Sequence, residues 1–248
     1  MRRILAAAML LAVCSQAGLR AGEMHSVDLS KQSNQKLDDG FGRMGPGNHL
    51  SRLPKGTQTF NDVVFEVGEG VLQLGGKILE KFPDRIDGIP VNRTCGRIHL
   101  LHSTCYGGHG KTDVPPEVVV KDETQIGEYI VHYEDGATSS IPLIYGRDVR
   151  DWWYVEGDSE PPSLGQVAWA GENDYSDQTV AGVRVYSSVW DNPYPEKTIK
   201  TIDFVGRKSA SVAAPFCIAI TLEDHDKAKG APGEKAGKPV SDATPGSR

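Results

Sequence analysis

The side chains best suited to binding a ligand lie in one run, RDVRDWW, which ends at Trp153. Aromatic rings can stack on the C–H faces of a sugar ring, while Asp148 and Arg150 could hydrogen-bond its hydroxyls. Adjacent residues of an extended segment point to opposite faces, so one of Trp152 and Trp153 is expected in the core and at most one at a ligand. This run, expected to be an exposed turn, predicts a carbohydrate-binding surface. In the alternative, both tryptophans are core and Arg150 pairs with Asp148 or Asp151.

A second aromatic and polar group follows later in the chain, where Trp190 precedes Asn192 and the sequence PYP. The two prolines stiffen this loop, which lowers the entropy lost on binding. Trp190 and Asn192 are therefore added to the candidate ligand-binding residues. The alternative is a rigid connector whose aromatic side chain covers one end of the fold.

Histidine and cysteine are spaced in a way that could hold a transition metal, at His99, His102, Cys105 and His109. His99 and His102 are three residues apart on a predicted strand, so they face opposite sides and cannot share an ion. The other three could converge through the Gly-Gly turn between them. Buried or solvated histidines are the commoner interpretation of such a group.

No familiar catalytic motif is present: the chain has no G-x-S-x-G, no H-E-x-x-H and no P-loop. Glycosidase chemistry needs two opposed carboxylates. Asp148, Asp151 and Glu156 are close enough in sequence to supply them, but the chain has 33 acidic residues, and such spacing is also typical of a solvated loop.

Short β-branched and aromatic runs, separated by Gly, Pro and Asp clusters, predict the elements that hold these side chains. Asp135-Gly136 predicts a tight hairpin turn with positive φ angles. No amphipathic helix is expected outside the N-terminal segment. An antiparallel β-sandwich is therefore predicted. Its strands are expected at Val63–Val67, Val71–Leu74, Arg97–His102, Glu128–Tyr133, Ser139–Tyr145, Val167–Ala170, Val183–Val189, Thr198–Val205 and Phe216–Leu222.

The ends of the chain differ in composition from its middle. Residues 1–17 have a basic start, a short apolar run and small residues before a cleavage point, as in a secretory signal peptide. The apolar run is too short to span a bilayer, and Cys14 offers a lipoprotein alternative. We expect a flexible leader over residues 18–26, one domain over residues 27–223, and a disordered, Lys-, Gly- and Pro-rich tail over residues 224–248.

Charge and cysteine content narrow the class of protein further. Cleavage would remove Arg2 and Arg3, leaving 25 basic against 33 acidic residues and a formal charge of −8. Nucleic acid is therefore not an expected partner. The strand between Cys95 and Cys105 would hold them about 33 Å apart, too far for a disulfide. These two and Cys217 are expected to be buried free thiols.

Several blocks resemble the galactose-binding-like jelly rolls of exported bacterial proteins. They are LPKG-TQTF-DVVFEV, RIDGIPVNR, RIHLLHST, VHYEDG, IPLIYGRDVRDWW, VWDNPYP, TIDFV and APFCIAIT, spread over residues 27–223. The resemblance implies a jelly-roll fold of the kind found in carbohydrate-binding modules. It also implies the possibility of a structural calcium, for which Asp38 and Asp39 offer oxygen ligands.

These observations lead to one expectation and two alternatives. We expect an exported, non-catalytic β-sandwich, located in the periplasm, on the cell surface or outside the cell, that binds a glycan through six residues. The first alternative is a structural or protein-interaction module of the cell envelope. The second is a glycoside hydrolase or polysaccharide lyase. The six residues are Asp148, Arg150, Trp152, Trp153, Trp190 and Asn192.

Overall fold

The protein is all-β in a computed structural model that describes residues 22–42, 45–108, 120–155, 157 and 160–225. Within these ranges the only helical element is the 3₁₀ turn η2 (Ser176–Gln178). The strands are β1 (Met24–Ser26), β2 (Gln35–Lys36), β3 (Gly56–Phe60), β4 (Val63–Val67), β5 (Gly70–Gln73), β6 (Arg85–Arg93), β7 (Arg97–Cys105), β8 (Gln125–Tyr133), β9 (Thr138–Ile144), β10 (Trp153–Val155), β11 (Gln166–Gly171), β12 (Ala181–Asp191), β13 (Ile199–Gly206) and β14 (Ala214–Glu223).

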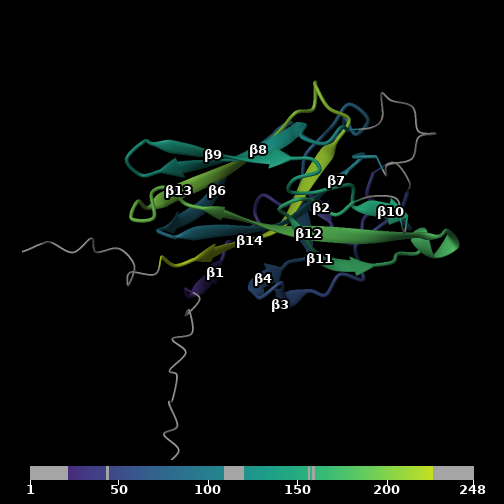
Figure 1. Cartoon of the computed structure of the whole chain (residues 1–248), viewed down its shortest axis with the longest axis horizontal. Coiled ribbons are helices and arrows are strands. Elements are labelled where there is room, and N and C mark those ends of the chain that lie inside the picture. Colours follow the sequence, from purple (N-terminus) through teal and green to yellow (C-terminus); the bar gives the residue numbers. More distant parts are fainter. Residues whose placement is uncertain (1–21, 43–44, 109–119, 156, 158–159, 226–248) are drawn as a thin grey trace, which may run out of the picture.

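Two antiparallel sheets form the body of the molecule (Figure 1). The large sheet runs in the order β10-β12-β7-β14-β5-β2, with β1 paired to β14 and β11 paired to β12. The small sheet runs β6-β13-β8-β9, and β3 and β4 form a separate hairpin. Such an arrangement is a β-sandwich, as the strand pattern predicts, and all nine predicted strands are present with ends shifted by a few residues.

The hairpin of β8 and β9 shows the alternation of side chains that is typical of a strand with one buried face. Tyr129, Val131 and Tyr133 are buried, while Ile130 and His132 between them are partly exposed. The turn differs from the predicted one, because Gly136 has a positive φ of 86° and Asp135 does not. Instead, the Asp135 carboxylate accepts the backbone N–H of Ala137, an Asx-type contact that stabilises the turn.

Two hydrophobic cores lie on the two faces of the large sheet. The inner core fills the space between the sheets and includes Leu100, Tyr129 and Phe204, with the Tyr129 and Phe204 rings stacked at 4.5 Å. The outer core lies between the large sheet, the β3–β4 hairpin and residues 37–42 and 45–53, and includes Phe65 and Phe216. Strands β7 and β14 serve both cores because successive side chains alternate between their faces.

Some boundaries differ from the sequence prediction. The expected flexible leader includes Met24–Ser26, which pair in register with Glu223, Leu222 and Thr221 of β14. Strand β6 was not predicted because Gly88 and Pro90 interrupt its pattern. These two residues are tolerated because β6 is an edge strand of the small sheet and pairs irregularly with β13. The predicted signal peptide and all but two residues of the predicted tail lie outside the described residues. Cys95, Cys105 and Cys217 are buried free thiols, as predicted.

Candidate functional site

The RDVRDWW turn is buried from Asp148 to Trp152, which corrects the expectation that it is exposed. Asp148, Arg150, Asp151 and Trp152 are 8%, 9%, 6% and 3% exposed. The turn follows β9, and Gly146 begins it with a φ of 80°, a backbone conformation that glycine adopts without strain. Its charged side chains therefore need partners inside the protein.

Asp148 and Arg150 have such partners. The Asp148 carboxylate accepts the backbone N–H of Ile144 at 2.7 Å and bonds the Arg147 guanidinium at 2.9 and 3.0 Å. Arg150 donates two parallel hydrogen bonds of 2.8 Å to the carboxylate of Asp122. Bidentate pairing of this kind holds both groups in one geometry. Arg150 therefore has a structural role, in which it links the turn to Asp122.

The two adjacent tryptophans separate as the alternation argument predicts. Trp152 packs in the outer core against Phe41 and Phe216, at centroid distances of 5.2 and 6.3 Å. Trp153 begins β10, is partly exposed, and meets Tyr175 edge to face at 5.7 Å. Only Trp153 of this pair can therefore offer part of its ring to a ligand.

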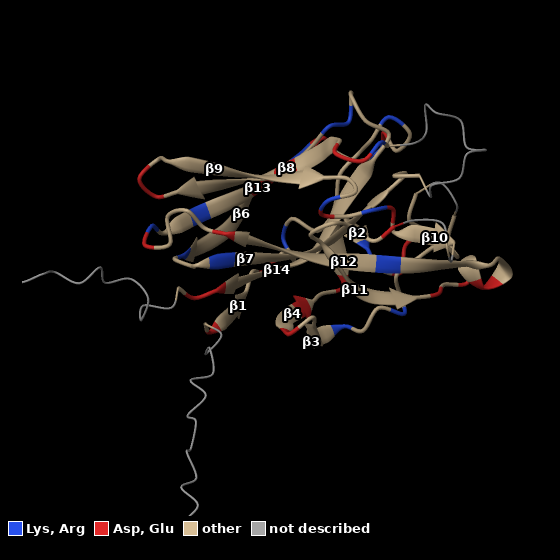
Figure 2. Cartoon of the chain, in the orientation of Figure 1, with Lys and Arg blue, Asp and Glu red and all other residues tan. Residues whose placement is uncertain are grey.

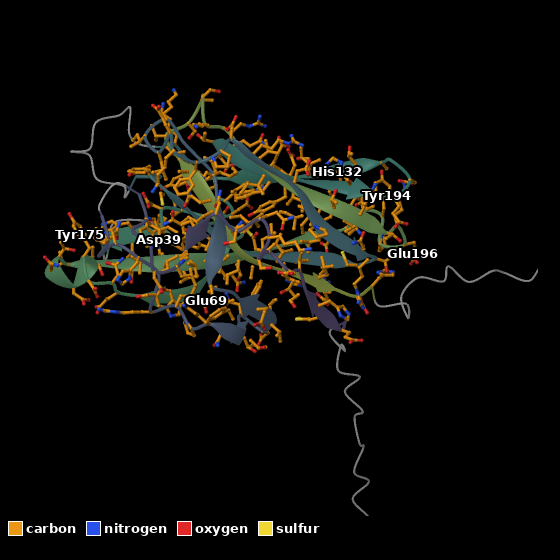
Figure 3. All side chains as sticks on the ribbon, turned by 180° about the vertical axis from the view of Figure 1, so that it is seen from behind. Asp39, Glu69, His132, Tyr175, Tyr194 and Glu196 are labelled. Carbon is orange, nitrogen blue, oxygen red and sulfur yellow. The ribbon has the colours of Figure 1, made fainter. Side chains whose placement is uncertain are left out.

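Trp190 and Asn192 lie far from Trp153. Trp153 is opposite Val183 on β12, and Trp190 is seven residues further along the same strand, about 23 Å at the usual rise of a strand. Figure 3 shows Tyr175, whose ring contacts Trp153, at one end of the molecule and Tyr194, which follows Trp190 in the chain, at the other. Asn192 is buried and bonded to Tyr133, to the carbonyl of Cys95 and to the backbone of Tyr194. The six predicted ligand-binding residues do not form one site.

Two hollows contain the predicted residues that remain accessible. The Trp153 hollow, about 240 Å³, is lined by Gly42, Asn48, Cys105, Tyr106, Asp151, Trp152 and Trp153. Its polar groups have partners within the protein. Both Asp151 carboxylate oxygens accept backbone N–H groups, and the Asn48 side chain bonds Phe41 and Asn173. This hollow therefore offers a ligand mainly apolar contact.

The second hollow, here called the Trp190 hollow, measures about 310 Å³ and combines an aromatic side chain with several polar ones. Its polar side chains are His102, Arg147, Asp148 and Ser188. The remaining lining residues are Leu100, Tyr129, Ile141, Pro142, Leu143, Leu164, Val189 and Trp190. Trp190 is partly exposed and packs against the inner core. Two of the six predicted residues, Asp148 and Trp190, meet here.

The pairing of strands explains why the sandwich is open at this point. Strand β9 is an edge of the small sheet, and β11 pairs with β12 only as far as Ser187. Beyond Ser187, β12 runs past the end of β11, and the Trp190 hollow lies between this part of β12 and β9. The buried turn after β9 then brings Arg147 and Asp148 to the same place.

The floor of the Trp190 hollow contains a contact that sequence reasoning missed. Ser188 Oγ lies 2.9 Å from His102 Nε2, and His102 Nδ1 lies 3.2 Å from the hydroxyl of Tyr129. Burial lowers the pKa of His102 to about 4, and the negative charge of Asp148 opposes this shift. The histidine is therefore neutral at neutral pH. Ser188 and His102 are 86 residues apart in sequence, so no local motif could have revealed them.

Of the three carboxylates considered for glycosidase chemistry, the two that the structure describes line different hollows. Asp148 lines the Trp190 hollow, whereas Asp151 lines the Trp153 hollow. Burial raises the pKa of Asp151 to about 7, against the effect of three backbone N–H groups that favour its ionised form. Glu156, the third candidate, lies outside the described residues.

Those candidate metal ligands that lie in the described ranges are also dispersed. His99 bonds Glu223 at 2.8 Å on the face of β7 opposite to His102, while Cys105 lies in the outer core and His109 is outside the described residues. Of the calcium candidates, Asp39 accepts the N–H of Lys36 in a turn and Asp38 lies 3.6 Å from Lys55 Nζ.

Among the described residues, one other group could place metal ligands close together: Glu23, His25 and Asp224. The Arg93 guanidinium lies 2.6 Å from His25 Nε2 and 3.5 Å from Asp224. A positive charge at that distance disfavours a bound cation.

Charge of both signs is spread over the molecule, since Lys and Arg as well as Asp and Glu occur on loops and strands across it (Figure 2). In the part of the chain that the structure describes, no helix combines the length and apolarity needed to cross a membrane. No family model, curated protein or solved structure matches this chain.

Proposed function

We propose that this protein is an exported carbohydrate-binding module and that the Trp190 hollow is its binding site. The observation that carries the proposal is a partly exposed tryptophan in one hollow with Arg147, Asp148 and Ser188. A hollow of about 310 Å³ is at the lower end of the range for small-ligand pockets, which suits one sugar ring better than a chain buried along its length.

The chemistry of the lining supports a sugar in particular. The indole face of Trp190 can stack on the C–H groups of a pyranose, and the serine, arginine and carboxylate groups can bond its hydroxyls. Arg147 and Asp148 are already held by their mutual hydrogen bonds and by the carbonyl of Pro142, so little side-chain entropy is lost on binding. The resemblance to galactose-binding-like jelly rolls agrees with this function, and export rests on the signal-like residues 1–17.

The test is a glycan array with the protein beginning at residue 18, followed by calorimetry on any glycan retained. We expect Trp190→Ala to weaken binding at least tenfold, which corresponds to about 1.4 kcal/mol. Trp153→Ala is the matched control, because Trp153 is also partly exposed but lines the other hollow.

Two results would overturn the proposal. One is a folded wild-type protein that retains no glycan on the array, which would favour the structural or protein-interaction alternative. The other is glycan binding that Trp153→Ala abolishes and Trp190→Ala leaves unchanged, which would move the site to the Trp153 hollow.

A further inference from the structure

Ser188 and His102 make the contact that a serine nucleophile and its general base require. The two residues lie on neighbouring antiparallel strands, with Ser188 opposite Leu100 and His102 opposite Tyr186, so both side chains point to the inner face. The distance of 2.9 Å between Ser188 Oγ and His102 Nε2 is within the range for proton transfer to a base. Ser188 is partly exposed and lines the Trp190 hollow, where a substrate could reach it.

A chain of hydrogen bonds from the inner core assigns the tautomer of His102. The thiol of Cys217 lies 3.7 Å from the carbonyl of Ala219 and donates to it. The sulfur can then act as an acceptor for the Tyr129 hydroxyl, its other hydrogen-bond partner. The Tyr129 oxygen is left to accept from His102 Nδ1 at 3.2 Å. Nε2 therefore carries no proton and accepts the hydroxyl of Ser188, as a general base must.

Charged groups in the same hollow match the charges that acyl transfer would create. The negative charge of Asp148 favours the protonated form of His102, which appears when Ser188 gives up its proton. Arg147 uses Nε and Nη2 for Asp148 and the carbonyl of Pro142. Its Nη1 bonds none of the described residues, so it can donate to an oxyanion in the hollow.

We propose that Ser188 is a nucleophile with His102 as its base, and that the Trp190 hollow hydrolyses small carboxylic esters. The Ser188 oxygen attacks the ester carbonyl carbon as its proton passes to His102 Nε2. The bond to the leaving alcohol then breaks, and the alkoxide takes that proton. Water next attacks the acyl-serine, again giving a proton to Nε2, which returns it to Ser188 as the acid is released. One ester and one water become one acid and one alcohol.

The proposed hydrolysis shares its hollow with the proposed sugar site but does not require a sugar. Its test is therefore made without glycan. The mature protein is incubated with a fluorophosphonate probe and digested, and the labelled peptide is identified by mass spectrometry. Hydrolysis of p-nitrophenyl acetate is followed in parallel. We expect one probe per chain, on Ser188, and ester hydrolysis above the buffer rate.

Variants separate a nucleophile from a serine with a structural role. Ser188→Ala should abolish labelling and hydrolysis. The control is Ser187→Ala, because Ser187 is its neighbour on β12 but bonds Asn61 on the opposite face. His102→Gln, which keeps a polar side chain, should slow labelling at least tenfold while circular dichroism stays unchanged. If Ser188→Ala does not fold, Ser188→Cys is used, and alkylation of the new thiol should be faster than in Ser188→Cys combined with His102→Gln.

The proposal is overturned if the folded wild-type protein is not labelled, or if the probe is found on a residue other than Ser188. Hydrolysis that survives Ser188→Ala, or a His102→Gln variant labelled at the wild-type rate, would overturn it equally. These results are independent of the carbohydrate proposal. Loss of glycan binding in Trp190→Ala tests that function, and the small probe reports only on Ser188.

Discussion

Asp151 is a buried carboxyl group held by the backbone around it. Its oxygens accept the N–H groups of Gly107 and Gly108 at 2.8 and 3.1 Å, and that of Trp153 at 3.1 Å. These bonds tie the end of β7 to the start of β10. Burial nevertheless dominates and raises the pKa of Asp151 from its usual 3.8 to about 7. The folded protein therefore holds a proton here that the unfolded chain releases near pH 4.

This raised pKa predicts how stability depends on pH. Because the folded pKa lies above the unfolded one, the contribution of Asp151 to stability is full below about pH 4 and is lost as pH rises towards 7. The Asp151→Asn variant has no carboxyl group at this position, so it lacks this pH-dependent contribution to stability. The free energy of unfolding of the variant minus that of the wild type should then rise between pH 4 and pH 7, by at most about 4 kcal/mol.

Urea unfolding of both proteins at half-unit pH steps measures this difference. Subtraction removes the other titrating groups, which the two chains share. A difference that stays constant from pH 4 to pH 7 would contradict the prediction.

At the scale of elements, the turn after β9 and the segment leading into β11 are packed backbone to backbone. The N–H of Ser163 bonds the carbonyl of Gly146, and the N–H groups of Leu164 and Gly165 both bond the carbonyl of Arg147. A Cβ added at Gly165 would overlap the carbonyl oxygen of Asp148. This close approach holds Arg147, Asp148 and Leu164 at the Trp190 hollow, so the hollow depends on a glycine that does not line it.

Gly165→Ala should therefore damage both stability and the Trp190 hollow. We expect a loss of about 1–3 kcal/mol in the free energy of unfolding, as for overpacking in a core, together with slower labelling of Ser188. The control is Gly68→Ala, where the added Cβ would meet nothing within 4 Å. Chemical denaturation and the fluorophosphonate probe give the two measurements. If the two alanine variants behave alike, the backbone contact at Gly165 does not position the turn.

At the scale of the whole molecule, the large sheet separates the two cores and contributes side chains to both. Leu100 of β7 faces the inner core and Leu101 faces the outer one, and β14 likewise contributes Ile220 to the inner core and Phe216 to the outer one. Neither core can be exposed without disturbing the strands of the other. The β3–β4 hairpin adds a third layer beneath this sheet (Figure 1).

Because the same strands contribute to both cores, we expect the domain to unfold in one step. Phe204→Ala in the inner core and Phe216→Ala in the outer core should each lower the free energy of unfolding by about 3–5 kcal/mol. For each variant, tryptophan fluorescence and far-ultraviolet circular dichroism should give the same midpoint in urea. Three of the four tryptophans, Trp152, Trp153 and Trp169, pack in or against the outer core, so fluorescence reports mainly on that core. Midpoints that separate in either variant would show two independently unfolding cores.

Local patterns in the sequence were sufficient for the fold class. Alternating β-branched and aromatic residues marked nine strands, because burying one face of a strand requires period two. Strand β6 was not predicted because Gly88 and Pro90 are unusual in a strand. It forms an irregular edge strand through its pairing with β13, which no local pattern reveals. The separation of Trp152 from Trp153 also followed from alternation alone, since it is a local property of extended chain.

The sequence by itself determined nine of the strands, the free thiols and which side chains of those strands share a face, because these depend on neighbours along the chain. Only the tertiary structure decided that the RDVRDWW turn is buried, that Trp153 and Trp190 lie too far apart for one site, and that Ser188 meets His102 across β12 and β7. The burial of the turn and the meeting of Ser188 with His102 depend on which strands pair and on where a strand ends. Here β11 pairs with β12 only as far as Ser187, and the Trp190 hollow lies beyond that point.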